Sequence, residues 1–384
     1  MKVAELLYEN REWKLERNDE HLNYENAQLV LAYGVRSSIE DASFFKMLKE
    51  KFPNSEIALS SSSGEIYSND VYDDTVAVTI LNFETAYLKT SRIDITDFPN
   101  SYEAGKLLIN QLPKEDLKWV FILSDGSSVN GSQLVEGLNS GRPEGVLITG
   151  GLAGDGDHFE KTVVGLNAVA EPNKIVAIGF YGNSLVLSHS SFGGWESFGL
   201  EKTVTKSQNN VLYEIDGKNA LELYKKYLGK YAQELPGSAL LFPLSLTSGD
   251  HAYPVVRTIL SVNENDNTMV FAGDLPEGSK VRFMKANIDR LIDAAHDAAN
   301  QCLEICPQNP KMAFIISCVG RKLVLGDRTA EEVDMVKDVL GPDTLIAGFY
   351  SYGEISPLRP FDKCVLHNQT ITITTINEIA HNGN

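Results

Sequence analysis

The sequence predicts an α/β fold, and three observations point to it. A pattern of strand, helix, strand and glycine turn occurs three times along the chain. The strands of each copy are almost continuously apolar, which is typical of parallel strands that are buried on both faces. Hydrophobic residues make up 43% and charged residues 22% of the 384 residues, so the chain has enough apolar surface for a sizeable core.

Each copy supplies two predicted strands and one predicted helix, identified by apolar runs, helical spacing and glycine stops. The expected first strands lie at 27–35, 118–126 and 312–321, the helices at 39–52, 131–141 and 329–341, and the returning strands with their turns at 56–66, 145–156 and 344–355. In open α/β sheets, ligands collect beyond the carboxyl ends of the strands. The three glycine turns lie at such ends, so we look for function there.

A different pattern separates the second copy from the third. Three alternating strands at 161–170, 174–182 and 185–192 are separated by turn residues, and they predict an additional antiparallel meander. Gly217 follows as a natural switch point. We therefore expect an N-terminal domain at 1–216 and a C-terminal domain at 217–384, packed together as two halves because no low-complexity linker joins them.

Charge and cysteine content exclude several classes of protein. Lys and Arg number 34 against 52 Asp and Glu, a net charge of −18, which disfavours nucleic acid and anionic membranes as partners. The four cysteines are too sparse for a disulfide framework, and free thiols are expected. The sequence shows no signal peptide and no run long enough for a membrane helix, so we expect a cytoplasmic protein.

Enzyme signatures are missing from the sequence. The P-loop and dinucleotide-binding patterns do not occur, and Ser351 misses the nucleophile-elbow spacing by one position. The seven histidines are scattered, and most are expected to be structural. His158 and His251 lie in predicted loops and are freer to meet a ligand. We therefore predict a protein that is not an enzyme.

The acidic residues at the turns are the sharper signal. Glu65, Asp155 and Glu354 each follow a turn glycine directly, and together they would accept hydrogen bonds from a small polar ligand. The other residues expected around this crevice are Ser62, Ser63, Gly64, Asp125, Gly151, Cys318, Arg321, Tyr350, Tyr352 and Gly353. Two structural alternatives stay open: the acids hydrogen-bond their own loops, and Arg321 forms a salt bridge with Glu354.

Eight segments in one order resemble the FIST family of bacterial sensory proteins, with its N-terminal and C-terminal FIST domains. The segments are 60–66, 150–156, 193–199, 256–260, 271–278, 317–321, 348–357 and 366–370. The resemblance implies a cytoplasmic signal-transduction sensor that binds a small ligand. Because the two FIST halves take up the whole length, we expect signalling to a separate protein such as a histidine kinase or a cyclic-di-GMP enzyme.

The resemblance also implies an alternative, because some family members bind haem and sense nitric oxide. Haem iron takes an axial His, Cys, Met or Tyr, and His251 and His158 are our candidates for that ligand. Two further hypotheses stay open. One is a hydrolase or lyase that uses the turn carboxylates as general acid and base, and the other is an acidic docking face without any ligand.

Overall fold

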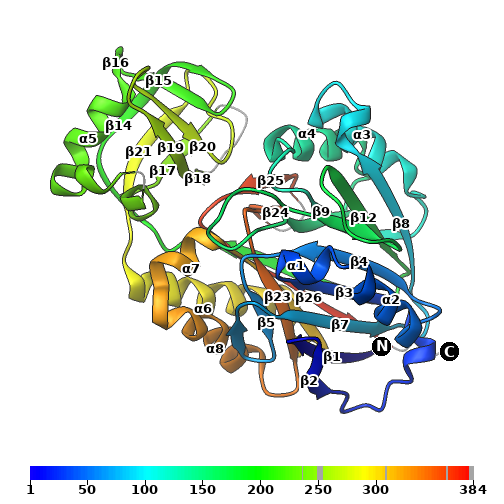
Figure 1. Cartoon of the computed structure of the whole chain (residues 1–384). Helices are drawn as coiled ribbons and strands as arrows, with labels where there is room; N and C mark the ends of the chain where they lie inside the picture. Colours follow the sequence, from blue (N-terminus) through cyan, green and yellow to red (C-terminus); the bar gives the residue numbers. More distant parts are fainter. Residues whose placement is uncertain (236, 249–253, 308, 360–361, 380–384) are drawn as a thin grey trace.

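A three-sheet body and a smaller lobe make up the computed structural model, which describes residues 1–235, 237–248, 254–307, 309–359 and 362–379 (Figure 1). The first sheet has the spatial order β11 (Val164–Leu166), β4 (Glu56–Ser61), β3 (Leu29–Gly34), β7 (Val76–Asn82), β1 (Lys2–Glu9) and β2 (Glu12–Arg17). The second has the order β25 (Cys364–His367), β24 (Gly353–Pro357), β10 (Leu147–Leu152), β9 (Leu117–Ser124), β12 (Lys174–Tyr181) and β8 (Tyr87–Asp94). The third has the order β13 (Leu185–Phe192), β26 (Ile371–Glu378), β22 (Met312–Cys318), β23 (Leu345–Ser351), β5 (Glu65–Tyr67) and β6 (Asp70–Tyr72).

All three predicted repeats form as expected, and the α/β class is confirmed. The returning strand of each copy pairs in parallel with its first strand, as β3 with β4, β9 with β10, and β22 with β23. The helices of the body are α1 (Arg36–Ile39), α2 (Ala42–Lys51), α3 (Ser101–Gln111), α4 (Gly131–Gly141), α6 (Ile288–Ile305), α7 (Val319–Leu325) and α8 (Thr329–Leu340). Short 3-10 turns lie at Tyr24–Asn26, Ile95–Asp97 and Gly326–Arg328.

Local sequence signals set the ends of the repeat helices. Asp41 and Asn130 precede α2 and α4, and their side chains accept hydrogen bonds from the Ser43 and Gln133 amides, as N-cap residues do. Gly341 ends α8 with a positive φ of 88°, which a glycine adopts without strain.

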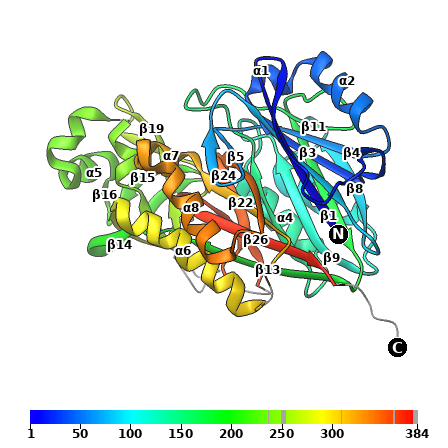
Figure 2. The same cartoon turned by 90° about the horizontal axis from the view of Figure 1, so that it is seen from below.

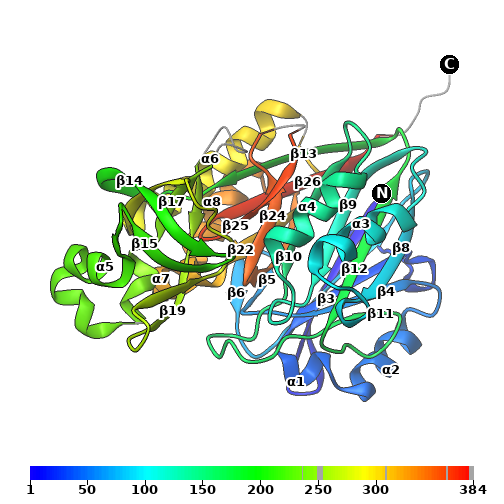
Figure 3. The same ribbon diagram turned by 90° about the horizontal axis from the view of Figure 1, so that it is seen from above.

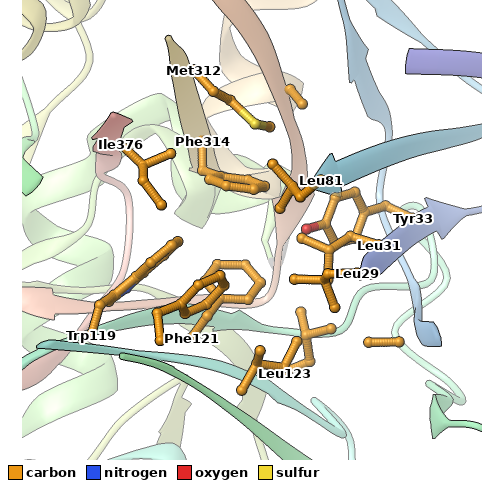
Figure 4. Packing of buried hydrophobic residues seen from close by; sticks show 14 of the residues in the cluster. Leu29, Leu31, Tyr33, Leu81, Trp119, Phe121, Leu123, Met312, Phe314 and Ile376 are labelled. Carbon is orange, nitrogen blue, oxygen red and sulfur yellow. The ribbon is translucent and has the colours of Figure 1, made fainter. Parts of the chain in front are cut away.

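The core of the body lies between the three sheets. Figure 4 shows side chains from all three sheets packed against one another: Leu29, Leu31 and Leu81 from the first, Trp119 and Phe121 from the second, and Met312 and Phe314 from the third. The outer face of each sheet is covered by helices, with α2 over the first, α3 and α4 over the second, and α6 and α8 over the third (Figures 2 and 3). This two-sided burial explains why the strands read as continuous apolar runs.

The predicted antiparallel meander is wrong. Its three strands, β11, β12 and β13, lie in three different sheets. Alternating polarity correctly indicated strands, but their partners are distant in the sequence: β11 pairs with β4, β12 with β8 and β9, and β13 with β26. The apolar pattern sets which face of a strand is buried, and it does not specify the neighbouring strand.

After each glycine turn, the chain leaves its own sheet for the edge of another. Strand β5 follows β4 yet pairs with β23, β11 follows β10 yet pairs with β4, and β24 follows β23 yet pairs with β10. Each unit thus contributes a strand to the sheet of another unit, and the three exchanges form a cycle. Since every turn has to cross between two sheets, all three turns are brought to the centre of the body.

The lobe is built on a single antiparallel sheet and stands to one side of the body (Figure 1). Its strands are β14 (Glu196–Gln208), β15 (Val211–Ile215), β16 (Lys218–Asn219), β17 (Leu244–Thr247), β18 (Val255–Arg257), β19 (Ile259–Asn263), β20 (Thr268–Phe271) and β21 (Lys280–Lys285). Its helical segments are α5 (Ala220–Leu228) and the 3-10 turns Gly229–Glu234 and Gly237–Leu241. The expected domain border at residues 216 and 217 falls inside this lobe, between β15 and β16. Within the described residues, no helix is both long and apolar enough to cross a membrane.

Candidate functional site

The three glycine turns meet at the centre of the body and are joined by backbone hydrogen bonds. These bonds run from the Ser63 amide to the Tyr350 carbonyl (2.9 Å), from the Tyr350 amide to the Gly64 carbonyl (2.9 Å), from the Gly154 amide to the Ser61 carbonyl (3.1 Å) and from the Tyr352 amide to the Leu152 carbonyl (3.1 Å). Every turn is bonded to at least one other. The three turns therefore form a packed junction at the strand ends, where the sequence predicted a crevice; we call it the turn junction.

Glu65 and Glu354 occupy equivalent positions in this junction, and each is held by one hydroxyl group of its own turn and one of a later loop. The Ser62 hydroxyl donates to Glu65 at 2.6 Å, and the Thr75 hydroxyl donates at 2.7 Å. In the same way Glu354 accepts from the hydroxyls of Ser351 at 3.0 Å and Thr370 at 2.8 Å. Both carboxylates are at most 1% exposed. These contacts favour the alternative in which the acids stabilise their own loops.

A small cavity beside the first turn, here called the turn pocket, collects several of the expected site residues. Its volume is about 250 Å³, and Ser62, Ser63, Gly64, Glu65, Asp155 and His158 are part of its lining. Arg36 also lines this pocket but was not predicted from the sequence; its Nε lies 3.2 Å from the Asp155 carboxylate. Lys322 was not predicted either; it donates to the Ser63 carbonyl at 2.9 Å and pairs with Asp73. Acids and bases therefore neutralise one another around this pocket.

Other expected site residues are buried, and their polar groups are bonded to other groups of the protein. Asp125 is 1% exposed and accepts from the Thr162 hydroxyl at 2.7 Å and the Ser127 amide at 2.7 Å. Tyr350 is fully buried and donates to Glu332 at 2.7 Å. Arg321 is fully buried as well and pairs with Glu332 at 2.8 Å. The expected Arg321 salt bridge with Glu354 is thus wrong, because the helix α7 that carries Arg321 faces α8.

The two remaining turn glycines serve backbone packing. A Cβ on Gly151 would lie 2.8 Å from the Ile316 side chain, and one on Gly353 would lie 3.0 Å from the side chains of Leu152 and Leu366. A Cβ at either position would therefore require these side chains to shift; the Gly151 neighbour belongs to the third sheet, and the Gly353 neighbours belong to its own sheet.

A cleft lies between the body and the lobe, and we call it the interlobe cleft. It consists of two adjoining chambers that share Phe159, Leu260, Ala272 and Tyr352. The Asp274 chamber, of about 390 Å³, lies between the loop 126–131 of the body and residues 271–274 of the lobe. The Thr258 chamber, of about 460 Å³, lies between residues 318–320 of the body and Leu240, Thr258, Ile259 and Val270 of the lobe.

Two predicted site residues, Tyr352 and Cys318, belong to this cleft. Tyr352 lines both chambers, and its ring stacks on Phe159 with centroids 4.7 Å apart. The Tyr352 hydroxyl accepts a hydrogen bond from the Phe159 amide at 3.0 Å. Cys318 lines the Thr258 chamber and is 3% exposed. All four cysteines are free thiols, as expected.

Comparison with known proteins places this architecture in a family. The FIST N domain matches residues 28–218, and the FIST C domain matches residues 220–357. The chain belongs to the FIST family. FIST domains are sensor domains of signal transduction that bind small ligands. An uncharacterized protein of Methanocaldococcus jannaschii, MJ1623, is 25% identical over 376 residues, which cover 88% of this FIST chain and 71% of the relative.

Among solved structures, the crystal structure of a cyanuric acid hydrolase from A. caulinodans is similar over 94% of this chain and 92% of that chain. The TM-score is 0.35 and the identity is 7%. At these values nothing about the chemistry of this FIST protein follows from the likeness.

His158 and Cys318 do not suit the axial position of haem, which the family resemblance raised as an alternative. Haem needs an apolar slot with an axial ligand. His158 is exposed and lies in the turn pocket among Asp73, Asp155 and Arg36, which is a charged setting. Cys318 lies in an apolar chamber, but burial raises the pKa of its thiol, which opposes the thiolate that binds iron. His251 lies outside the described residues. We propose no haem site.

Burial of the turn carboxylates predicts how the stability of this FIST protein depends on pH. Burial raises the pKa of Glu65 from 4.5 to about 8, so between these pH values the folded state holds a proton that the unfolded state releases. The free energy of unfolding is therefore expected to fall as pH rises from about 4.5 to about 8. Urea unfolding at pH 5.0, 6.5 and 8.0 measures this slope.

The variant Glu65→Gln isolates the contribution of that carboxyl group. Because glutamine does not titrate, the slope is expected to be smaller in Glu65→Gln than in the wild type. Glu103→Gln, which changes an exposed glutamate of α3, should keep the full slope. Equal slopes in the wild type and Glu65→Gln would rule out a raised pKa at this position.

Proposed function

We propose that this FIST protein is a non-catalytic sensor whose small-molecule ligand binds in the interlobe cleft. One observation carries this proposal: each chamber of the cleft is lined partly by the body and partly by the lobe. A ligand bound there would contact both parts at once, and its binding energy would depend on their relative position. Binding can therefore shift the position of the lobe, as in hinge-type sensors.

The chain connections between body and lobe suit such a movement. Residues 193–195 lead into the lobe, and Ala286 and Asn287 lead out of it. The two connections run side by side, because the Asn287 side chain donates to Glu196 at 3.0 Å. Two adjacent connections allow rotation about one axis. We propose that a separate signalling protein reads this rotation, and a histidine kinase and a cyclic-di-GMP enzyme are the partner classes that fit a FIST sensor.

The positions of the turn carboxylates support a non-catalytic role. A general acid or base has to reach the substrate within hydrogen-bonding distance. Glu65 and Glu354 are buried, and each accepts hydrogen bonds from a hydroxyl group of its own turn and from one of a later loop. Neither carboxylate lines the interlobe cleft. We therefore assign them to the stability of the turn junction.

Retention of metabolites tests the proposed site. The purified protein is incubated with a metabolite extract of cells, washed, and denatured, and the released compounds are identified by mass spectrometry. A compound retained by the wild type should be lost from Ala272→Trp, because Ala272 lines both chambers and an indole there would fill the space between them. Equal retention by both proteins, or none by either, would contradict the proposal. An unchanged circular dichroism spectrum shows that the variant is folded.

A further inference from the structure

We infer that the interlobe cleft selects neutral or cationic amphipathic molecules and rejects anions, an inference that rests on the proposed function of this cleft. The two chambers differ in chemistry and adjoin each other, because four residues line both. A ligand that fills both would place a polar end in the Asp274 chamber and an apolar body in the Thr258 chamber. The stacked rings of Phe159 and Tyr352 lie between the two ends.

Asp274 provides an acceptor at the polar end. Its position is fixed from three sides: the Asn130 side chain donates to Oδ1 at 3.1 Å, its own amide donates to the Ser132 hydroxyl at 3.2 Å, and its carbonyl accepts from Arg257 Nε at 3.1 Å. Among the described residues, no group donates to Oδ2. A fixed carboxylate oxygen that faces a chamber is suited to an ammonium or hydroxyl group of a ligand.

Thr258 provides one polar contact within the apolar chamber. It is 5% exposed, and its Oγ1 has no hydrogen-bond partner in the described part of the chain. Around it lie Leu240, Ile259, Val270 and Val319. A buried hydroxyl without a partner destabilises the protein unless something else supplies the hydrogen bond. We assign that partner to the ligand, as one polar group within an otherwise apolar body.

The charges of the lining exclude anions. Asp274 and Glu160 line the Asp274 chamber, and neither chamber has a Lys or Arg among its described lining residues. Arg257 is 5% exposed and does not line either chamber; its guanidinium donates to the carbonyls of Asp274 at 3.1 Å and Leu366 at 3.0 Å. A carboxylate ligand would lose its hydration without gaining a cation.

Two sets of matched probes test the inference by isothermal titration calorimetry. One set is tryptamine, tryptophol and indole-3-acetate, and the other is phenethylamine, 2-phenylethanol and phenylacetate. The amines and alcohols are expected to bind the wild type about tenfold or more tightly than the acids, which corresponds to about 1.4 kcal/mol. Ala272→Trp should abolish binding of all of them, because it fills the cleft.

Substitutions at the two ends should discriminate between the probes. Asp274→Asn is expected to weaken the amines about tenfold, because a charge-assisted hydrogen bond becomes a neutral one, and to leave the alcohols nearly unchanged. Thr258→Val should weaken tryptamine about threefold or more by removing the acceptor for the indole N–H, and it should not affect phenethylamine. Asp97→Asn, at an exposed aspartate that lines neither chamber, is the control for net charge and should change nothing.

Three results would overturn the inference, and they remain distinguishable from failure of the proposed function. The inferred ligand class would be wrong if the acidic probes bind the wild type as tightly as the amines do. If their binding is also lost in Ala272→Trp, that result would still support the cleft as the binding site. Probes that bind Ala272→Trp as tightly as the wild type would bind outside the cleft. If none of the six probes binds, the ligand class is wrong. The cleft would still be established as the binding site if the wild type retains a metabolite that Ala272→Trp does not retain.

Discussion

Replacing Arg321 by methionine is expected to lower the free energy of unfolding by about 3 to 5 kcal/mol, the typical effect of removing one partner of a buried ion pair. Arg321 and Glu332 are both fully buried, and Arg321 Nη2 lies 2.8 Å from the Glu332 carboxylate. Methionine fills the space of the arginine stem but leaves Glu332 as an unpaired buried charge. Denaturant unfolding monitored by circular dichroism measures the change.

The ion pair also joins several segments of the chain, so its loss is expected to affect more than the two residues themselves. Arg321 also donates to the carbonyls of Gly193 at 2.6 Å and Leu291 at 2.7 Å. Glu332 accepts from the hydroxyls of Ser317 at 2.9 Å and Tyr350 at 2.7 Å. Gly193 lies at the connection to the lobe, and residues 318–320 line the cleft. Arg321, a candidate ligand residue in the sequence, is thus a positioning residue between the two.

Two further variants distinguish the effect of breaking the buried ion pair from the effect of removing a positive charge elsewhere. Arg328 pairs with Asp289 and Glu331 while 43% of its side chain is exposed, so Arg328→Met is expected to cost less than about 1 kcal/mol. The double variant Arg321→Met with Glu332→Leu should recover part of the lost stability, because no charge is left unpaired. A similar cost for Arg321→Met and Arg328→Met would refute this account.

The repeated units could be predicted from the sequence, because apolar runs and glycine stops are local signals. Strand pairing between units could not. The strands β5, β11 and β24 each follow a glycine turn and pair with a strand of another unit, and nothing in their own residues identifies that partner. Convergence of the three turns follows from this exchange, so the sequence could suggest it only through the similarity of the turns.

The candidate site was predicted in part for the same reason. Residues at the strand ends of the repeats were recognisable, and two of them, Tyr352 beside Gly353 and Cys318 at the end of β22, line the interlobe cleft. Thr258 and Asp274 were missed because they lie in the lobe, outside the repeats. A signal for them existed: both belong to segments that carry the family resemblance, 256–260 and 271–278. Glu65 and Glu354 are assigned to the stability of the turn junction because they are buried. The burial of an acidic residue cannot be predicted from its neighbours in the sequence.

Gly348→Ala is expected to prevent stable folding, with a cost above about 4 kcal/mol, the range reached only by severe changes in the core. A Cβ at this position of β23 would lie 1.8 Å from the carbonyl oxygen of Ile315 in the adjacent strand β22. Backbone atoms of two central strands cannot move apart without breaking the parallel ladder. Yield of soluble protein and the urea midpoint measure the effect.

Gly150 and Gly145 provide a matched pair of comparisons. Gly150 occupies the equivalent position of the second unit, and its Cβ would lie 2.0 Å from the Ile122 carbonyl oxygen, so Gly150→Ala should be as severe. Gly145 has a φ of 78°, but a Cβ there would have no atom within 4 Å, so Gly145→Ala should cost only about 1 to 2 kcal/mol for the left-handed backbone. If Gly348→Ala unfolds at the same urea concentration as Gly145→Ala, close approach of the strands is not what requires glycine there. A large effect at both Gly150 and Gly348 would instead show that the second and third units share the same close approach of strands next to the turn junction, where the first unit has Leu59.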